Sequence, residues 1–129
     1  MAGDGQETAI DIRERAFQFA VRVVNLCKYL EKNSEVSRNV ISQLLRAGTS
    51  VGANLEEAKA GQSTADFIHK NAIALKEARE SNYWLRLIIA TEKFAEKIPL
   101  GLEDLRDESM IFAKIVDKSI ITAKKSRTL

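Results

Sequence analysis

The sequence predicts an all-α protein, an antiparallel up-down-up-down four-helix bundle. Four long segments repeat apolar residues at helical spacing, and none shows the apolar–polar alternation of a strand. Short connections separate these segments, which favours antiparallel packing of neighbouring helices. The single proline and six glycines leave little material for turns, so the chain favours few, long elements.

The composition is typical of a single globular domain over residues 1–129. Hydrophobic residues make up 45% and charged residues 29%, a balance that disordered chains lack. The one cysteine, Cys27, provides no disulfide framework of the kind that small secreted domains use. The polar start of the sequence carries no secretory signal, and no apolar run reaches the roughly 18 residues of a membrane span. We therefore expect a cytoplasmic protein with no membrane contact.

The first helix is expected over residues 9–33, after a flexible segment at residues 1–7. Thr8 is the expected N-cap, because Asp11 follows three residues later as in a capping box. The expected buried stripe follows the 3.6-residue period and consists of Ala16, Phe19, Ala20, Val23, Cys27 and Leu30.

A second line along this helix is polar to basic and contains no acidic residue. It consists of Arg15, Gln18, Arg22, Asn25, Tyr29 and Lys32. One interpretation is a solvated face, and the other is a basic ridge that meets an acidic partner or phosphates. In the second interpretation Arg15, Arg22 and Lys32 are the candidate nucleic-acid contacts.

The second helix is expected over residues 36–60, with Ser34 or Ser37 as its cap. Its apolar stripe consists of Val40, Leu44, Ala47, Val51, Leu55 and Ala58. Gly48 and Gly52 lie inside this helix, and each lowers the stability of the helix by about 0.5–1 kcal/mol relative to alanine. Glycines in a helix interior indicate a neighbouring helix at close range, so we expect tight packing here.

The third helix is expected over residues 64–95, behind Gly61 and a capping box at Ser63. Its expected apolar line consists of Ile68, Ala72, Leu75, Ala78, Leu85 and Ile89. The end of this helix, WLRLIIA, is apolar on more than one side, which indicates several neighbours or a subunit interface.

After a turn at Pro99, the fourth helix is expected over residues 102–124, with residues 125–129 flexible. Its apolar positions are Leu105, Phe112, Ile115, Val116 and Ile120. Acidic side chains gather at its start and basic ones at its end, a distribution that matches the helix dipole.

A polar network is expected between the second and third helices. Its candidate members are Gln43, Arg46, Ser50, Asn54, Glu57, Glu77 and Glu80. Arg46 requires a carboxylate, which Glu77 and Glu80 can supply, and Lys70 can match Glu57. The network either fixes the register of the two helices or lines a polar groove for a ligand or nucleic acid. Arg46→Ala is expected to cost about 3–5 kcal/mol if the guanidinium is buried and paired.

The sequence offers no catalytic, metal-binding or cofactor-binding constellation. His69 is the only histidine, so the paired Glu-x-x-His motifs of a di-metal bundle are missing. Cys27 lies on the apolar stripe, where a buried and inert thiol is expected. Phosphate-binding glycine loops and nucleophile elbows are also missing. We therefore expect a protein that is not an enzyme and needs no cofactor.

Two blocks of the sequence resemble a known family. The run QLLRAGTSVGANLEEA at residues 43–58 and the run from Asp66 to Leu85 resemble the motifs of small bacterial four-helix proteins, many encoded in intervening sequences of 23S rRNA genes. The resemblance implies an antiparallel bundle that assembles as a homopentamer, without enzymatic activity or cofactor. The related accessory proteins of diversity-generating retroelements form pentameric barrels that bind nucleic acid and a reverse transcriptase. This chain differs from those proteins in its net charge of only +2.

The expected function is therefore that of a non-enzymatic, oligomeric binding or scaffolding bundle. Its expected partners are further copies of the chain, most simply in a pentamer, and RNA or DNA as ligand. The alternative is a protein–protein adaptor ring with no nucleic-acid role. No small-molecule substrate is expected.

Overall fold

The computed structural model describes residues 11–61, 63–93, 95–98 and 101–128. They form α2 (Ile12–Asn33), α3 (Arg38–Ala60), α4 (Thr64–Thr91), the short 3₁₀ helix η1 (Ala95–Lys97) and α5 (Leu102–Thr128). No strand occurs among these residues, and the predicted all-α four-helix bundle is confirmed. None of their helices has an apolar stretch long enough to cross a bilayer.

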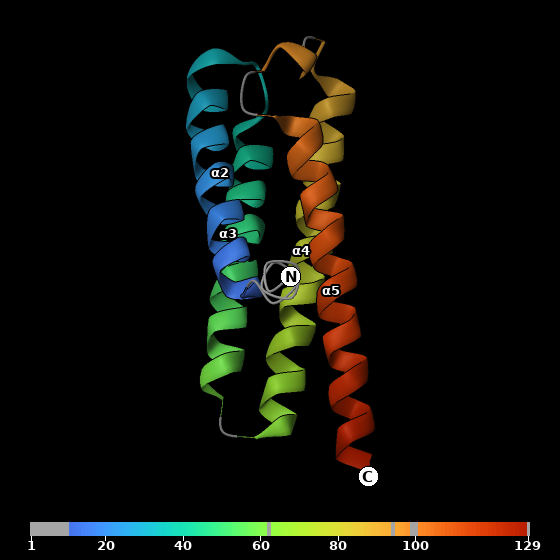
Figure 1. Ribbon diagram of the computed structural model, residues 1–129. Helices are drawn as coiled ribbons and strands as arrows, with labels where there is room; N and C mark the ends of the chain where they lie inside the picture. The colour runs from blue at the N-terminus through green and yellow to red at the C-terminus, as the bar shows by residue number, and fades with distance from the viewer. Residues whose placement is uncertain (1–10, 62, 94, 99–100, 129) are drawn as a thin grey trace, which may run out of the picture.

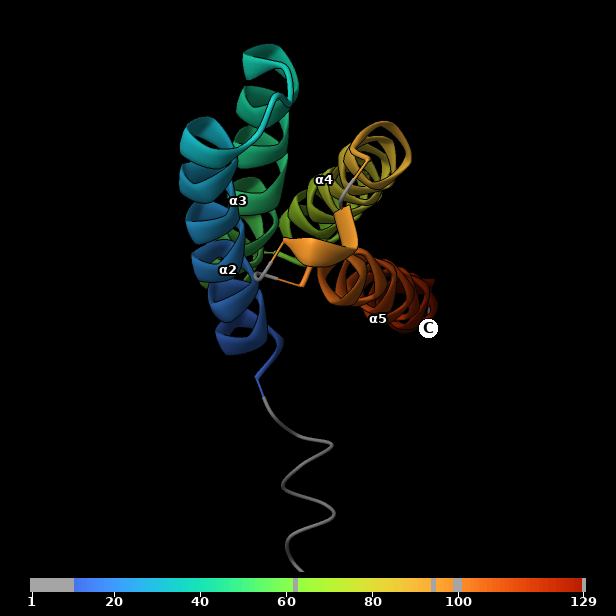
Figure 2. The ribbon, with the colours of Figure 1, turned by 90° about the horizontal axis from the view of Figure 1, so that it is seen from above.

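Consecutive helices run in opposite directions along the bundle (Figure 1). Seen along the axis, α3 lies beside α2 and α5 lies beside α4 (Figure 2). Contacts are extensive between α2 and α3, between α3 and α4 and between α4 and α5, but sparse between α2 and α5. The bundle is therefore closed along three of its seams and loosely closed along the fourth.

Side-chain caps set where the helices begin. The Asp11 carboxylate accepts a hydrogen bond from the Arg13 amide at 2.9 Å, so α2 begins at Ile12 and not at residue 9. The predicted Thr8 cap and the expected flexible residues 1–7 lie outside the described residues. Ser37 caps α3, and Ser63 caps α4 by accepting from the Asp66 amide at 3.1 Å, as expected.

Two helix ends differ from the prediction. The helix α4 ends at Thr91 instead of residue 95, because Ala95 and Ile98 turn back to pack against the core. This tertiary contact outweighs a local sequence that has no helix breaker before Pro99. The helix α5 continues to Thr128, past the predicted end at residue 124, since nothing in its last turns opposes helix formation. The segment expected to be flexible is therefore helical through residue 128.

The buried faces of α2 and α3 follow the predicted stripes closely, with Ile41 buried where Val40 was expected. The face of α4 is rotated from the prediction, since Ala72 is exposed and Ile68 and Leu75 are only half-buried. Its buried line consists of Asn71, Ala74, Glu77, Ala78, Ser81, Asn82, Leu85 and Ile88.

Two of the polar residues on this line, Asn71 and Ser81, bond within their own helix. Asn71 donates to the Phe67 carbonyl and Ser81 to the Glu77 carbonyl, each at 2.8 Å. A hydrophobic pattern misses such residues, since it counts every polar side chain as exposed. On α5 the predicted apolar line holds except for Ile115, which is 36% exposed.

The glycines of α3 allow α2 to approach closely, as predicted. A Cβ atom added at Gly48 would lie 2.8 Å from Cγ1 of Val23, well inside van der Waals contact. At Gly52 the nearest atom would be the Ala16 Cβ at 3.4 Å, an ordinary contact. The two glycines therefore differ: the first has no room for a side chain, and the second does.

We predict that Gly48→Ala lowers the free energy of unfolding by about 1–3 kcal/mol, because the clash with the fully buried Val23 outweighs the gain in helix propensity. Gly52→Ala is the matched control and should raise the free energy by up to about 1 kcal/mol. Urea unfolding followed by circular dichroism measures both. Equal effects of the two substitutions would contradict this account of the helix contact.

Candidate functional site

Arg46 is the centre of the polar network between α3 and α4. Its Nη1 donates to both carboxylate oxygens of Glu77, at 3.2 and 3.3 Å. Its Nη2 donates to Oε2 of Glu80 and, at 3.1 Å, to Oε1 of Gln43 on the same helix. One guanidinium thus joins two carboxylates one turn apart on α4 to an amide on α3, which fixes the register of the two helices.

Trp84 extends this network, and the sequence pattern did not assign it to the network. Its indole Nε1 donates to Oε2 of Glu80 at 3.0 Å, so Glu80 bridges Arg46 and Trp84. The Trp84 ring also packs edge-on against Tyr83, with 5.2 Å between the ring centres. The four-residue spacing of Glu80 and Trp84 is the signal that could have revealed the bond.

The other predicted members of the network lie further along α3. Ser50 and Asn54 donate to the Arg46 and Ser50 carbonyls, at 2.7 and 2.9 Å, and so bond to their own helix. Glu57 forms a separate ion pair with Lys70 at 2.8 Å. Hydrogen bonding to Lys70 holds the pKa of the Glu57 carboxyl below its usual value. The predicted stripe therefore divides into two cross-helix links with a self-bonded stretch between them.

The Arg46 cluster lies at the edge of the interface and not in its interior. The side chain of Arg46 is 47% exposed, that of Glu80 is 28% exposed and that of Glu77 is 10% exposed. Water therefore reaches the guanidinium, and the cost of 3–5 kcal/mol expected for a buried arginine does not apply. Glu77 is the member that depends on the pairing, because its carboxylate is largely removed from solvent.

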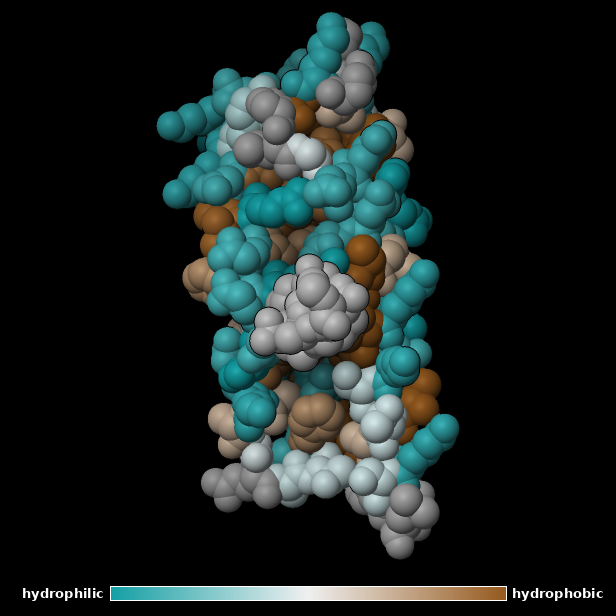
Figure 3. All heavy atoms as spheres, in the orientation of Figure 1, coloured by the Kyte–Doolittle hydropathy of each residue, from teal (hydrophilic) through white to brown (hydrophobic). Residues whose placement is uncertain are grey.

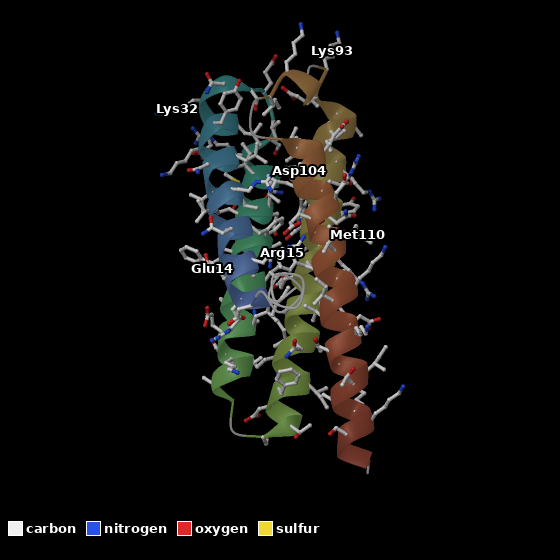
Figure 4. All side chains as sticks on the ribbon, in the orientation of Figure 1. Glu14, Arg15, Lys32, Lys93, Asp104 and Met110 are labelled. Carbon is white, nitrogen blue, oxygen red and sulfur yellow. The ribbon has the colours of Figure 1, made fainter. Side chains whose placement is uncertain are left out.

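The basic line on α2 meets an acidic partner inside the same chain. Arg15 donates to both carboxylate oxygens of Glu108, at 2.6 and 2.9 Å, and Arg22 donates to Asp104 at 2.7 Å. Figure 4 shows Arg15 and Asp104 between α2 and α5, while Lys32 points away at the end of α2. Hydrogen bonding to Glu108 raises the pKa of the Arg15 guanidinium above its usual value. Lys32 alone among the three candidates keeps its charge free of an ion pair in the described structure.

The sequence contained the signal for these pairs. Arg15 and Arg22 are seven residues apart on one helix, and Asp104 and Glu108 are four apart on another. Antiparallel neighbours bring such spacings together in reverse order, and this is the order observed. The acidic residues were interpreted through the helix dipole alone, so their role across the seam was missed.

The remaining reactive side chains occupy ordinary structural positions. Cys27 is 4% exposed, its Sγ lies 3.7 Å from the Ile41 carbonyl, and burial raises the pKa of the thiol to about 11. His69 is exposed on α4. In the described ranges no cluster of three or more His, Cys, Asp or Glu residues is arranged to hold a metal ion. These positions show how the two residues pack and provide no catalytic geometry.

We predict that Arg46→Ala lowers the free energy of unfolding by about 1–2 kcal/mol, since the sheltered Glu77 carboxylate loses its donor. The matched control is Arg13→Ala, which removes a half-buried arginine whose carboxylate partners Asp11 and Glu56 are both exposed, and it should cost only about 0–1 kcal/mol. Adding Glu77→Gln to Arg46→Ala should restore part of the loss. Urea unfolding of the unmodified protein and the three variants measures these free energies, and no recovery on adding Glu77→Gln would contradict the dependence of Glu77 on Arg46.

Comparison with known proteins places this bundle among its relatives. The family model described as 23S rRNA-intervening sequence protein matches residues 8–110. A crystal structure from Bacteroides thetaiotaomicron, of a protein with unknown function from the S23 ribosomal protein family, shares 41% sequence identity at a TM-score of 0.77. The match covers 85% of this chain and 98% of the other chain. A search of curated proteins finds no match. The chain belongs to the family of 23S rRNA-intervening sequence proteins.

Proposed function

We propose that the protein is a non-enzymatic, homo-oligomeric bundle that binds nucleic acid through the C-terminal half of α5. The observation that carries this proposal is the charge of that half. Residues 111–129 contain five basic side chains and one acidic side chain, although the whole chain has a net charge of only +2. They also lie beyond residues 8–110, the part that the family model matches.

Three lysines of this segment are available to an external ligand. Lys114, Lys118 and Lys124 are exposed, and none of them forms an ion pair with another described residue. A phosphate backbone attracts such side chains through counterion release and needs no particular base sequence. The free lysines make the end of α5 a better candidate contact than the predicted ridge on α2, where Arg15 and Arg22 already hold carboxylates.

The surface also supports association of copies. Among the described residues, half of the exposed large apolar side chains lie on α5: Met110, Ile111, Ile115 and Ile121. Figure 3 shows apolar side chains along α5 on the face turned to the viewer. Met110 and Ile111 are 42% and 39% exposed and adjacent, and such a patch favours a protein contact. A homopentamer, as the resemblance implies, would bring five basic helix ends into one field and strengthen binding to a polyanion.

The alternative function, a protein–protein adaptor ring, draws on the same apolar side chains. It differs in needing no contact with phosphates, so it predicts no dependence of a ligand's affinity on salt. A cytoplasmic location belongs to both proposals, and the single buried cysteine suits a reducing compartment.

For nucleic acid, we predict that a fluorescently labelled RNA hairpin or DNA duplex binds at low salt and dissociates steeply as salt rises. Lys114→Glu with Lys124→Glu should reduce the salt slope by about 2, because two phosphate contacts are lost. The control pair, Lys28→Glu on α2 with Lys93→Glu just after α4, changes the net charge equally and should leave the slope nearly unchanged. Fluorescence anisotropy measures the affinities. Failure of the unmodified protein to bind either probe at low salt would end the nucleic-acid proposal.

For assembly, we predict that sedimentation equilibrium gives five times the mass of the chain. Ile111→Glu should shift the protein toward smaller species, since a charge then replaces an apolar contact. The control substitution, Glu35→Lys in the connection between α2 and α3, should leave the mass unchanged. A monomer at all concentrations for the unmodified protein would overturn the oligomeric part of the proposal and leave the nucleic-acid part to be judged separately.

A further inference from the structure

A groove of about 960 Å³ lies at the end of the bundle where α3 turns into α4. Ala58 and Lys59 of α3, Phe67 of α4 and the outer turns of α5 from Ile115 to Ser126 line it. A smaller hollow of about 290 Å³ adjoins it, because the two share Ala58, Lys59, Phe67 and Ser119. The hollow reaches Ile12 at the start of α2. The groove thus continues from the described end of α2 along the axis of the bundle.

The groove lies past the start of α2, which begins at Ile12, between helices that extend further along the axis. The ion pair between Arg15 and Glu108 marks the level of the first turn of α2. From Glu108 to Ser126, α5 continues for roughly 27 Å at 1.5 Å per residue. Figure 1 shows α3, α4 and α5 extending past the start of α2. Three helices therefore line a position that a fourth helix occupies elsewhere in the bundle.

The lining suits a helix in shape. On α5 the groove residues Ile115, Ser119, Thr122 and Ser126 follow at intervals of four, three and four, so they form one face. Most of the lining side chains are small, and Phe67 and Ile115 are the large apolar groups. Small side chains beside a few large ones produce the grooves into which the ridges of another helix fit.

The charge of the lining is of one sign. Lys59 and Lys118 are the charged residues among those that line the groove, and no carboxylate lies among them. Both lysines are exposed and form no ion pair in the described structure. Asp11, in the adjoining hollow, is already held by Arg13 at 2.5 Å. A complementary helix would therefore carry carboxylates beside its apolar face.

We propose that this groove binds an acidic amphipathic helix of a partner protein. The apolar face of that helix lies on Phe67 and Ile115, and its carboxylates meet Lys59 and Lys118. The site completes the bundle at the open end, and it goes beyond the proposed binding of nucleic acid, since its ligand is a protein segment that is recognised by shape and charge together.

The test uses the full-length ¹⁵N-labelled protein and a synthetic helical peptide of roughly fifteen residues, about 22 Å long. One face of the peptide carries leucine and alanine, and the other carries glutamate. We expect its addition to shift the amide resonances of Phe67, Ser119 and Thr122. A peptide with lysine in place of glutamate should bind at least about tenfold more weakly, because it faces like charges.

Variants locate the contact. Lys59→Glu should weaken the acidic peptide about tenfold, and Thr122→Trp should abolish binding by filling the groove. The matched control is Lys114→Glu, an exposed α5 lysine that does not line the groove, which should leave peptide affinity unchanged while weakening RNA.

Four results would overturn the proposal. The first two are equal binding of both peptides and no binding of the acidic peptide. The third is a set of amide shifts confined to residues outside the groove, and the fourth is a loss of RNA affinity in Lys59→Glu as large as its loss of peptide affinity. The first would leave no role for charge, and the last would make the groove part of a nucleic-acid surface. A fifth check is dilution without peptide: concentration-dependent shifts at Phe67 and Ser119 would assign the groove to a second copy of the chain instead.

Discussion

The close approach of α2 to α3 at Gly48 is the contact on which the rest of the bundle depends. Val23 occupies the space that a side chain at residue 48 would need, so Val23 of α2 meets α3 there with no intervening side chain from α3. Because contacts between α2 and α5 are sparse, α2 is positioned mainly by its packing against α3. The ion pairs of Arg15 and Arg22 then fix the position of α2 against α5. Such exposed ion pairs add little to the free energy of unfolding, but their geometry is specific.

Polar side chains at the helix interfaces find hydrogen-bond partners in two distinct ways. Inside α4, Asn71 and Ser81 bond to carbonyls of their own helix and leave the interface to apolar atoms. At the margin, Arg46 gathers two carboxylates where water still reaches it. Asn82 combines both situations, since it is buried but donates across to the Arg106 carbonyl of α5 at 3.2 Å. No buried polar side-chain atom of the described residues lacks a partner, so this division leaves no uncompensated desolvation.

The helical period was enough to predict the fold class and most of the buried residues of α2, α3 and α5. The period did not predict the buried face of α4, because Asn71 and Ser81 are polar residues that are buried there. Their polar groups bond to carbonyls of the same helix, so they need no partner on another helix. The pairing of Arg46 with Glu77 and Glu80 could be anticipated from spacing and charge, but its exposure could not, since exposure depends on how far each helix is rotated. The spacing of Arg15 and Arg22 and of Asp104 and Glu108 permits their pairing, but the relative height of α2 and α5 that selects these pairs cannot be read from either helix alone.

The pairing across the α2–α5 seam also shapes the field around the molecule. It neutralises acidic side chains at the start of α5, while Lys114, Lys118 and Lys124 further along the helix form no ion pair in the described structure, so positive charge gathers in the second half of α5. A protein with its charge distributed in this way is oriented by the electric field of a polyanion before the two molecules come into contact. In the nucleic-acid binding proposed above, this charge distribution would favour a first encounter at the end of α5, with the orientation selected at a distance and before contact.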